Sequence, residues 1–173
     1  RRKGQPSQTE VALDVEEGGD EEAWIDQLLG ILGSIDPSAF ERLTQRLLRE
    51  SGFTKVEVTG RSGDGGIDGI GILRMNLVSF QVLFQCKRWK GSVGPSEVRD
   101  FRGAMVGRAD KGLIVTTGTF SSDARKEATR DGAPAIDLVD GETLCGLLKE
   151  RKLGISVQTV ERVELDEAFF RAI

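Results

Sequence analysis

The strongest constraint on the fold is the order of short apolar runs in the second half of the chain. Residues 112–116 and 135–139 have the composition of buried strands, and a helical pattern at 121–130 lies between them. Two parallel strands need a long crossover connection, which is usually a helix. This alternation therefore predicts β-α-β units on a sheet with parallel strands.

Three further strand-like runs lie upstream, at 55–59, 67–73 and 77–87. Gly-rich or Arg-Met-Asn turns separate them, which predicts an antiparallel meander. Helical patterns at 96–106 and 142–149 follow. The sequence thus predicts an α/β fold with a mixed β-sheet flanked by helices, in the order α-β-β-β-α-β-α-β-α.

Two helical patterns precede these strands. The first begins at residue 21 and ends near Gly33, with its apolar residues on one helical face. The second is expected from Asp36-Pro37 to Gly52, because Asp can cap free amides and Pro is tolerated in a first helical turn. Its buried stripe is predicted to comprise Phe40, Leu43, Leu47 and Leu48.

The length of 173 residues suits one domain. Residues 1–20 are polar, Gly-rich and without a period, so we expect a linker or disordered tail there, left after an upstream domain. We assign 21–154 to one domain with its leading helix. We expect the extension 155–173 to pack on the same domain.

The absence of histidine excludes several kinds of chemistry. With no His among 173 residues, Ser-His-Asp hydrolysis and His-ligated zinc or haem sites cannot be built. No apolar run approaches the roughly 18 residues of a bilayer span, and no signal peptide is evident. We therefore expect a cytoplasmic protein whose chemistry comes from carboxylates, amides, hydroxyls or Lys.

The charge of the chain is unevenly distributed. The formal net charge is −4, but residues 55–108 carry nine basic and five acidic side chains. A basic segment of this kind permits a site for a polyanion such as DNA. The basic residues nearest the candidate chemistry are the expected phosphate contacts, although each is as readily a solvated surface residue: Arg88, Lys90, Arg99 and Arg102.

A candidate catalytic group combines residues from two predicted strands. Gln85 and Lys87 are two residues apart, so they project from the same face of one strand. Asp68 lies in the preceding strand after a Gly-rich turn, and a hairpin would bring it beside Gln85. A carboxylate, an amide oxygen and an ammonium on one surface suit Mg²⁺-assisted phosphodiester hydrolysis, which needs hard oxygen ligands and open positions for water and phosphate.

At this point the sequence resembles the Mrr-like restriction endonucleases of the PD-(D/E)xK nuclease superfamily, in the variant with Gln in place of the second acid. The resemblance rests on Asp-Pro-Ser-Ala-Phe-Glu at 36–41, Gly-Asp-Gly-Gly-Ile-Asp-Gly at 63–69 and Gln-Cys-Lys-Arg-Trp at 85–89. It extends over roughly 21–173. It implies a restriction-endonuclease-like three-layer core.

The resemblance also implies site residues and partners. Asp68 is the principal Mg²⁺ ligand, Gln85 the second metal ligand, and Glu41 an additional acidic catalytic position. Lys87 activates water or stabilises the phosphorus transition state, and the sequence does not decide between these roles. Mn²⁺ is expected to substitute for Mg²⁺. The substrate implied is double-stranded DNA, cut by a bacterial or archaeal type IV enzyme that requires modified, methylated bases and acts as a homodimer or higher assembly.

Other interpretations remain open at this stage. The same core occurs in junction-resolving and repair nucleases, and the neutral Gln85 also suits a non-catalytic DNA-binding or sensor module. Glu41 is alternatively a solvated helix residue, Asp68 a turn residue, and Gln85 with Lys87 a polar strand edge. Trp89 is expected in the core more often than in a stacking role. Comparison of branched and linear duplexes would separate the nuclease classes.

Overall fold

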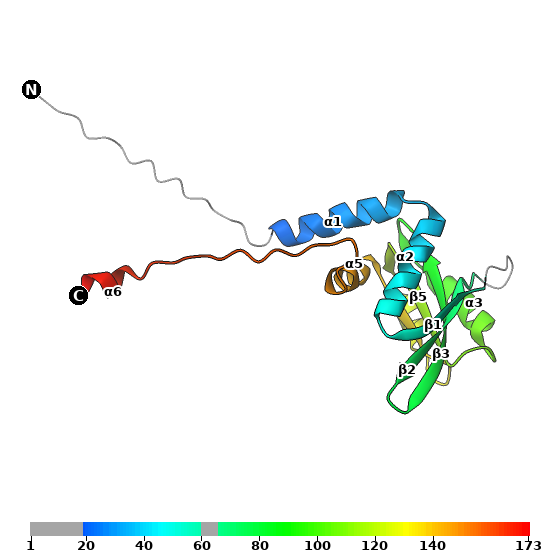
Figure 1. The fold of residues 1–173 in the computed structure, drawn as a ribbon. Helices are drawn as coiled ribbons and strands as arrows, with labels where there is room; N and C mark the ends of the chain where they lie inside the picture. Colours follow the sequence, from blue (N-terminus) through cyan, green and yellow to red (C-terminus); the bar gives the residue numbers. More distant parts are fainter. Residues whose placement is uncertain (1–18, 60–65) are drawn as a thin grey trace, which may run out of the picture.

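A five-stranded sheet with strand order β1-β2-β3-β5-β7 is the centre of the fold (Figure 1). This computed structural model describes residues 19–59 and 66–173. The strands of the main sheet are β1 (Phe53–Val58), β2 (Gly69–Met75), β3 (Val78–Lys87), β5 (Lys111–Thr116) and β7 (Ile136–Val139). A second sheet pairs β4 (Ser92–Val93) with β6 (Thr119–Phe120). The helices are α1 (Gly19–Ser34), α2 (Pro37–Glu50), α3 (Pro95–Met105), α4 (Ser122–Ala128), α5 (Gly141–Glu150) and α6 (Glu167–Arg171).

The pairing of the strands confirms the predicted mixed sheet. Strands β1, β2 and β3 form an antiparallel meander. Strands β3, β5 and β7 are parallel, and α3 and α4 supply the crossovers between them. Asn76 has a left-handed φ of 48° in the tight turn between β2 and β3, a conformation that Asn tolerates better than most residues. The predicted elements are found within a few residues, whereas the sequence did not predict β4, β6 and α6.

The sheet is buried on both faces, which explains its nearly continuous apolar strands. On one face, Ile114 and Leu83 pack with side chains of α3 and α4, such as Phe101 and Ala124. On the other face, Val115 and its neighbours pack against α1, α2 and α5. Adjacent residues of β5 therefore belong to different cores, as the alternation of side chains along a strand requires.

The helix starts are fixed locally. Pro37 occupies the first turn of α2, as predicted, but the side chain of Asp36 makes no capping hydrogen bond. Ser121 is the N-cap of α4, and its Oγ accepts a hydrogen bond of 3.1 Å from the Ala124 amide. Asp140 caps α5 in the same way, since its carboxylate accepts from the Thr143 amide at 3.0 Å.

The two ends of the chain differ from the prediction in different ways. Residues 19 and 20 already belong to α1, and the rest of the predicted 1–20 linker lies outside the described residues. After Ile155, which packs on the core, every residue of 156–173 is exposed. Figure 1 shows this segment, orange to red, running away from the sheet to α6. The expected packing of 155–173 on the domain is therefore not found beyond Ile155.

None of the helices in the described part of the chain has the length and apolar composition of a membrane span.

A buried arginine joins α3 to α4. Arg102 is 5% exposed, and its guanidinium donates to the backbone carbonyls of Pro134 and Glu127. The Glu127 carboxylate lies 3.7 Å from Arg102 Nε, and Arg99 and Arg130 approach the same carboxylate at 3.8 and 3.5 Å. Burial lowers the pKa of Arg102, while the charge of Glu127 acts in the opposite direction. Arg102 therefore has a structural role, which argues against the predicted contact with DNA.

We expect Glu127→Gln to lower the free energy of unfolding by about 2–4 kcal/mol, because it leaves the buried Arg102 charge beside two other guanidinium groups without a counter-charge. The matched control is Asp123→Asn, which removes an exposed carboxylate from the same helix and should cost less than about 0.5 kcal/mol. Urea unfolding followed by circular dichroism measures both. A Glu127→Gln protein as stable as the control would contradict the assigned role.

Candidate metal-binding site

The central feature of the site is the way β3 fixes the carboxylate of Asp68. Asp68 directly precedes β2, and its amide donates to the Phe84 carbonyl at 3.0 Å. Its Oδ2 accepts a hydrogen bond of 2.5 Å from the Cys86 amide. The backbone of Asp68 is thereby bound to Phe84, and its side chain is bound to the Cys86 amide of β3. The expected hairpin thus brings Asp68 beside Gln85.

Gln85 supplies a buried amide oxygen that has no partner within the described part of the chain. The residue is 9% exposed, and its Oε1 makes no hydrogen bond to residues 19–59 or 66–173. Leaving a buried acceptor unsatisfied costs about 1–3 kcal/mol, so such a group calls for an explanation. A hard cation bound next to Asp68 would satisfy this oxygen.

Two glycines of the Gly-rich motif make room for this arrangement. Gly66 has a left-handed φ of 79°, and a Cβ on it would lie 2.1 Å from Gln85 Nε2. Gly69 follows Asp68, and a Cβ there would lie 2.4 Å from the Glu57 carbonyl oxygen and from the Phe84 ring. A side chain at either position would displace a neighbour. Positions 60–65, which include the first half of the motif and Asp64, lie outside the described residues.

Glu41 approaches the site from the opposite face of the sheet. It lies on α2, is half-buried, and precedes Thr44 by one turn. Thr44, Glu41 and Asp68 all lie close enough to Cys86 to affect its thiol. Burial raises the pKa of Cys86 well above its usual value, a hydrogen bond with Thr44 lowers it, and the negative charges of Asp68 and Glu41 raise it further. The structure thus brings Glu41 and Asp68 into electrostatic range of the same strand residue.

Lys87 ends β3 on the same face as Gln85. Its Nζ lies 5.2 Å from the centroid of the Trp89 ring, and Trp89 is 43% exposed rather than in the core. A second acid, Glu97, stands in the first turn of α3 within range of this ammonium. The pKa of Glu97 is lowered by its own backbone amide, then by the Ser96 hydroxyl, and also by the charge of Lys87. The sequence analysis missed Glu97, because only the tertiary fold brings α3 to the end of β3.

The donor atoms fit a hard cation rather than a soft one. Within the described ranges, no group of three or more His, Cys, Asp or Glu residues is arranged to hold a metal ion. Asp68 and Gln85 instead offer one carboxylate and one amide oxygen. Mg²⁺ is commonly bound through one or two carboxylates while keeping several waters, so this sparse oxygen set suits it. We therefore assign the candidate metal site to these two residues, with Lys87 beside them.

The four predicted DNA contacts separate into two pairs. Arg88 donates to the carbonyls of Gly33 at 3.1 Å and of Ile35, and so ties the α1–α2 corner to the end of β3. Arg102 is buried, as described above. Lys90 and Arg99 are exposed, with 53% of the Arg99 side chain accessible. Lys90 and Arg99 therefore remain the candidates for phosphate contacts.

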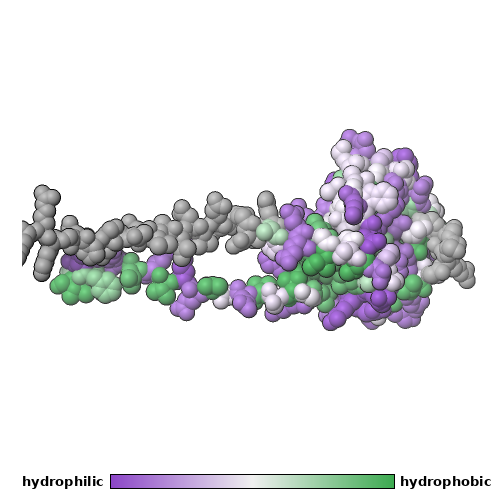
Figure 2. Space-filling model, turned by 90° about the horizontal axis from the view of Figure 1, so that it is seen from above, coloured by the Kyte–Doolittle hydropathy of each residue, from purple (hydrophilic) through white to green (hydrophobic). Residues whose placement is uncertain are grey.

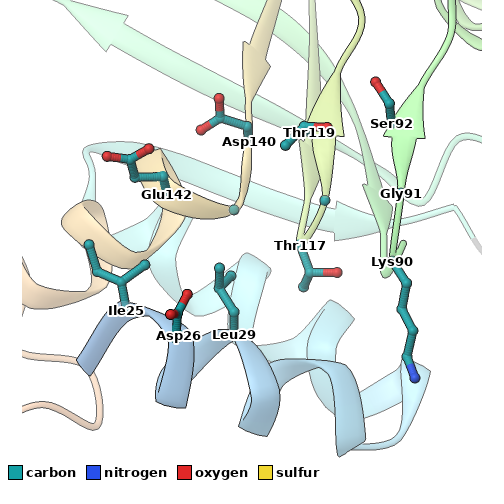
Figure 3. Close-up of a pocket in the computed structure, with 12 residues that line it drawn as sticks. Ile25, Asp26, Leu29, Lys90, Gly91, Ser92, Thr117, Thr119, Asp140 and Glu142 are labelled. Carbon is teal, nitrogen blue, oxygen red and sulfur yellow. The ribbon is translucent and has the colours of Figure 1, made fainter. Parts of the chain in front are cut away.

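Lys90 also lines a cleft of about 560 Å³ (Figure 3). The cleft lies between α1, the loops around Lys90 and Thr117, and the start of α5. Figure 3 shows Lys90 at one end, with Asp26, Asp140 and Glu142 toward the other. Neither Asp68 nor Gln85 lines it, so it is separate from the candidate metal site.

Comparison with known proteins relates the chain to a family of nucleases. The family model Mrr_cat, described as a restriction endonuclease, matches residues 32–148. The type IV methyl-directed restriction enzyme EcoKMrr of Escherichia coli is 35% identical over 154 residues, which cover 86% of this chain and 50% of that enzyme. The chain thus spans about half the length of this curated relative.

Two solved structures share the fold. One is the DNA modification-dependent restriction endonuclease AspBHI, with a TM-score of 0.64, 26% identity, and coverage of 76% of this chain and 36% of its own. The other is the MspJI restriction endonuclease in complex with a 27-mer oligonucleotide, with a TM-score of 0.62 and 29% identity. That match covers 86% of this chain and 35% of MspJI. These neighbours confirm the predicted fold class.

We expect Gly66→Ala to weaken divalent-ion binding about tenfold, because the added methyl group would push the Gln85 amide away from Asp68. Titration calorimetry with Mg²⁺ and Mn²⁺ measures the affinity. Gly154→Ala is the matched control, since Gly154 has a similar φ of 69° but nothing within 4 Å of an added Cβ. Equal ion affinities in the two variants would show that Gly66 does not position Gln85.

Proposed function

The chain belongs to the Mrr_cat family of restriction endonucleases, and from this premise we propose that it is a Mg²⁺-dependent DNA endonuclease domain. One observation carries the proposal. The Asp68 carboxylate is fixed against β3 next to the unsatisfied Gln85 oxygen, on the strand that ends in Lys87. An oxygen pair with an adjacent ammonium suits hydrolysis of a phosphodiester without histidine.

In this proposal each residue has a separate task. Asp68 and Gln85 hold the ion, which when bound polarises the phosphate and lowers the pKa of a water. Lys87 orients the attacking water and offsets the negative charge that develops on the phosphate oxygens. Glu41 adds negative charge behind β3 and supports the ion from the α2 side. Lys90 and Arg99 hold the DNA backbone near the site.

The proposed substrate is double-stranded DNA that carries modified bases. The support is similarity to a methyl-directed enzyme and to modification-dependent endonucleases. This chain matches only about half of the first and a third of the second, so we assign choice of the modification to the remainder of such a protein. Because two strands must be cut, we propose that two copies act together on DNA, in the cytoplasm of a bacterium or archaeon.

We expect the protein to nick plasmid DNA with Mg²⁺ or Mn²⁺ and not with EDTA. Asp68→Ala and Lys87→Ala should each reduce the rate about a hundredfold or more, since one removes an ion ligand and the other a charge that stabilises the transition state. Gel analysis of supercoiled, nicked and linear plasmid measures the rate.

The matched controls are Asp123→Ala and Lys126→Ala, which remove an exposed acid and an exposed Lys from α4. Both should nick like the wild type. The comparison is made on methylated and unmethylated plasmid and on a branched duplex, which distinguishes a modification-dependent enzyme from a junction-resolving one. If neither this chain nor the full-length protein nicks DNA with either ion, the enzyme proposal is wrong and a binding module is favoured.

We expect Gln85→Glu to lower the Mg²⁺ concentration for half-maximal nicking roughly tenfold, because it restores a second negative oxygen ligand. Gln81→Glu adds the same charge to an exposed position of the same strand and should leave the Mg²⁺ dependence unchanged. The measurement is the nicking rate as a function of Mg²⁺ concentration. An unchanged requirement in Gln85→Glu would mean that residue 85 does not bind the ion.

A further inference from the structure

Trp89 is an exposed aromatic residue just after the strand that carries the candidate metal site. It is 43% exposed and follows Lys87 by two residues. No other described aromatic side chain outside the segment 156–173 is exposed. That segment carries Phe169 and Phe170, and Figure 2 shows it extending from the body with green, hydrophobic residues toward its end. An exposed tryptophan on the body itself, beside Lys87, therefore calls for an explanation.

The fold holds the backbone of Trp89 in place. The Thr117 hydroxyl accepts a hydrogen bond from the Trp89 amide and donates one to the Trp89 carbonyl, both at 2.9 Å. Gly118 permits this close approach, because a Cβ on it would lie 3.0 Å from the same carbonyl oxygen and 2.2 Å from that of Gly91. The fold thus fixes the residue while it leaves the indole ring exposed.

The ring borders a cleft of about 540 Å³, here called the Trp89 cleft. Four residues of α1 and two loop residues complete its lining: Leu29, Gly30, Gly33, Ser34, Lys90 and Thr117. A cavity of roughly 150 Å³ accepts a benzene ring, so this cleft has room for a nucleobase and its sugar.

Gly30 and Gly33 keep the α1 side of the Trp89 cleft open. They are three residues apart, so they share one face of the helix. Glycine is unfavourable inside a helix. Neither residue has a left-handed φ, and a Cβ on either would meet nothing in the described part of the chain within 4 Å. Neither backbone conformation nor internal packing therefore requires these glycines, whereas a ligand lying against α1 would account for both.

The charges around the cleft suit the backbone of DNA. Lys90 is the only charged residue of the lining that the structure describes. The larger cleft in Figure 3 also contains Lys90, but its acids lie toward the other end: Asp26, Asp140 and Glu142. Asp140 is paired with Arg125, and the other two acids disfavour a phosphate backbone at that end. A bound strand is therefore expected at the end with Trp89 and Lys90.

Trp89 is close to the place where the proposed chemistry occurs. Lys87 Nζ lies 5.2 Å from the centroid of the indole ring. Successive nucleotides of one strand are about 3.4 Å apart along a duplex. With Lys87 at the phosphate that is cut, the ring lies within one or two nucleotides of that phosphate. The face of a base inside a duplex is covered by its neighbours, so a base that stacks on the ring must first leave the stack.

We propose that Trp89 stacks on one base of the bound DNA, which leaves the duplex next to the phosphate that is cut and enters the Trp89 cleft. Lys90 then contacts the backbone phosphate of that nucleotide. This inference rests on the proposed function, because Lys87 defines which phosphate is cut.

The base is held by its face rather than read by its edge. The Thr117 hydroxyl is occupied by the backbone of Trp89, and Ser34 Oγ donates to the Ile31 carbonyl at 2.8 Å. The Gly33 carbonyl accepts from Arg88. These polar groups of the cleft already have partners, whereas stacking on an aromatic ring tolerates any base. The Trp89 cleft should therefore accept a base without preference for its identity.

The test compares two short duplexes that differ by one unpaired base in the middle of one strand, in a low-salt buffer with EDTA. The unpaired base needs no removal from a pair, so the chain should bind the bulged duplex about tenfold more tightly than the paired one. Trp24→Phe leaves Trp89 as the only tryptophan, so the fluorescence of this variant reports on Trp89 alone. The bulged duplex should quench it.

Two pairs of variants test the contact, with affinity measured by fluorescence anisotropy of labelled DNA. Trp89→Leu should bind the bulged duplex about tenfold more weakly and lose the preference for it, whereas Trp89→Phe keeps an aromatic face and should retain most of both. The matched control is Trp24→Leu. Trp24 also has an ammonium, that of Lys149, 5.2 Å from its ring centroid, but it is not among the residues that line either cleft.

The second pair fills the cleft without changing Trp89. Gly30→Leu places a side chain in the Trp89 cleft and should weaken binding of the bulged duplex about tenfold. Gly146→Leu makes the same change at an open helical position of α5 and should bind like the wild type. Circular dichroism verifies that each variant is folded.

Three results would overturn the proposal: Trp89 fluorescence that is unchanged by bound DNA, equal affinity of the wild type for the two duplexes, or a Trp89→Leu protein that keeps the preference. A chain that binds neither duplex would also overturn it. None of these measurements requires cleavage. Nicking by the wild type without stacking on Trp89 would leave the proposed function intact. Stacking in a protein that does not nick DNA would contradict the proposed function and leave the base-binding role of Trp89.

Discussion

The pairing of β3 on both sides is the constraint on which the site depends. Its antiparallel register with β2 places Asp68 opposite the segment from Phe84 to Cys86, and the Cys86 amide then binds the carboxylate. Its parallel register with β5 buries the same segment, so that the Gln85 oxygen is cut off from water. A slip of one residue in the β2–β3 register would exchange the faces of Gln85 and Cys86.

Burial of β3 on two faces also divides the site between two cores. Gln85 and Lys87 project toward α3, where Glu97 approaches the ammonium. Cys86 projects toward α2, where Thr44 and Glu41 lie. The electrostatic environment of the candidate metal site is therefore assembled from the meander and from helices on both sides of the sheet. Such a site cannot form before the layers pack.

The sequence predicted the elements that depend on local pattern and missed those that depend on tertiary distance. The strand-like runs, and the helical pattern between 112–116 and 135–139, were enough to predict a mixed sheet. The contacts of long side chains were harder to predict, because a guanidinium can bind carbonyls that are distant in the sequence. Arg88 donates to the Gly33 carbonyl, and Arg102 donates to the Pro134 carbonyl. The segment 156–173 was expected to pack on the domain, but the structure leaves all of its residues exposed. A sequence pattern does not show which surface a run of apolar side chains contacts.

The neutral amide at position 85 has a consequence for the folded protein without an ion. Asp68 and Glu41 already place two negative charges near Cys86, and a carboxylate at position 85 would add a third in a site that excludes water. Like charges in such an environment repel strongly and favour protonation of one of them. Gln85 retains an oxygen donor without this repulsion, so the site can be fully formed before the ion binds. The cost is a weaker attraction for a cation, which in the proposed enzyme would couple activity more closely to the concentration of free Mg²⁺.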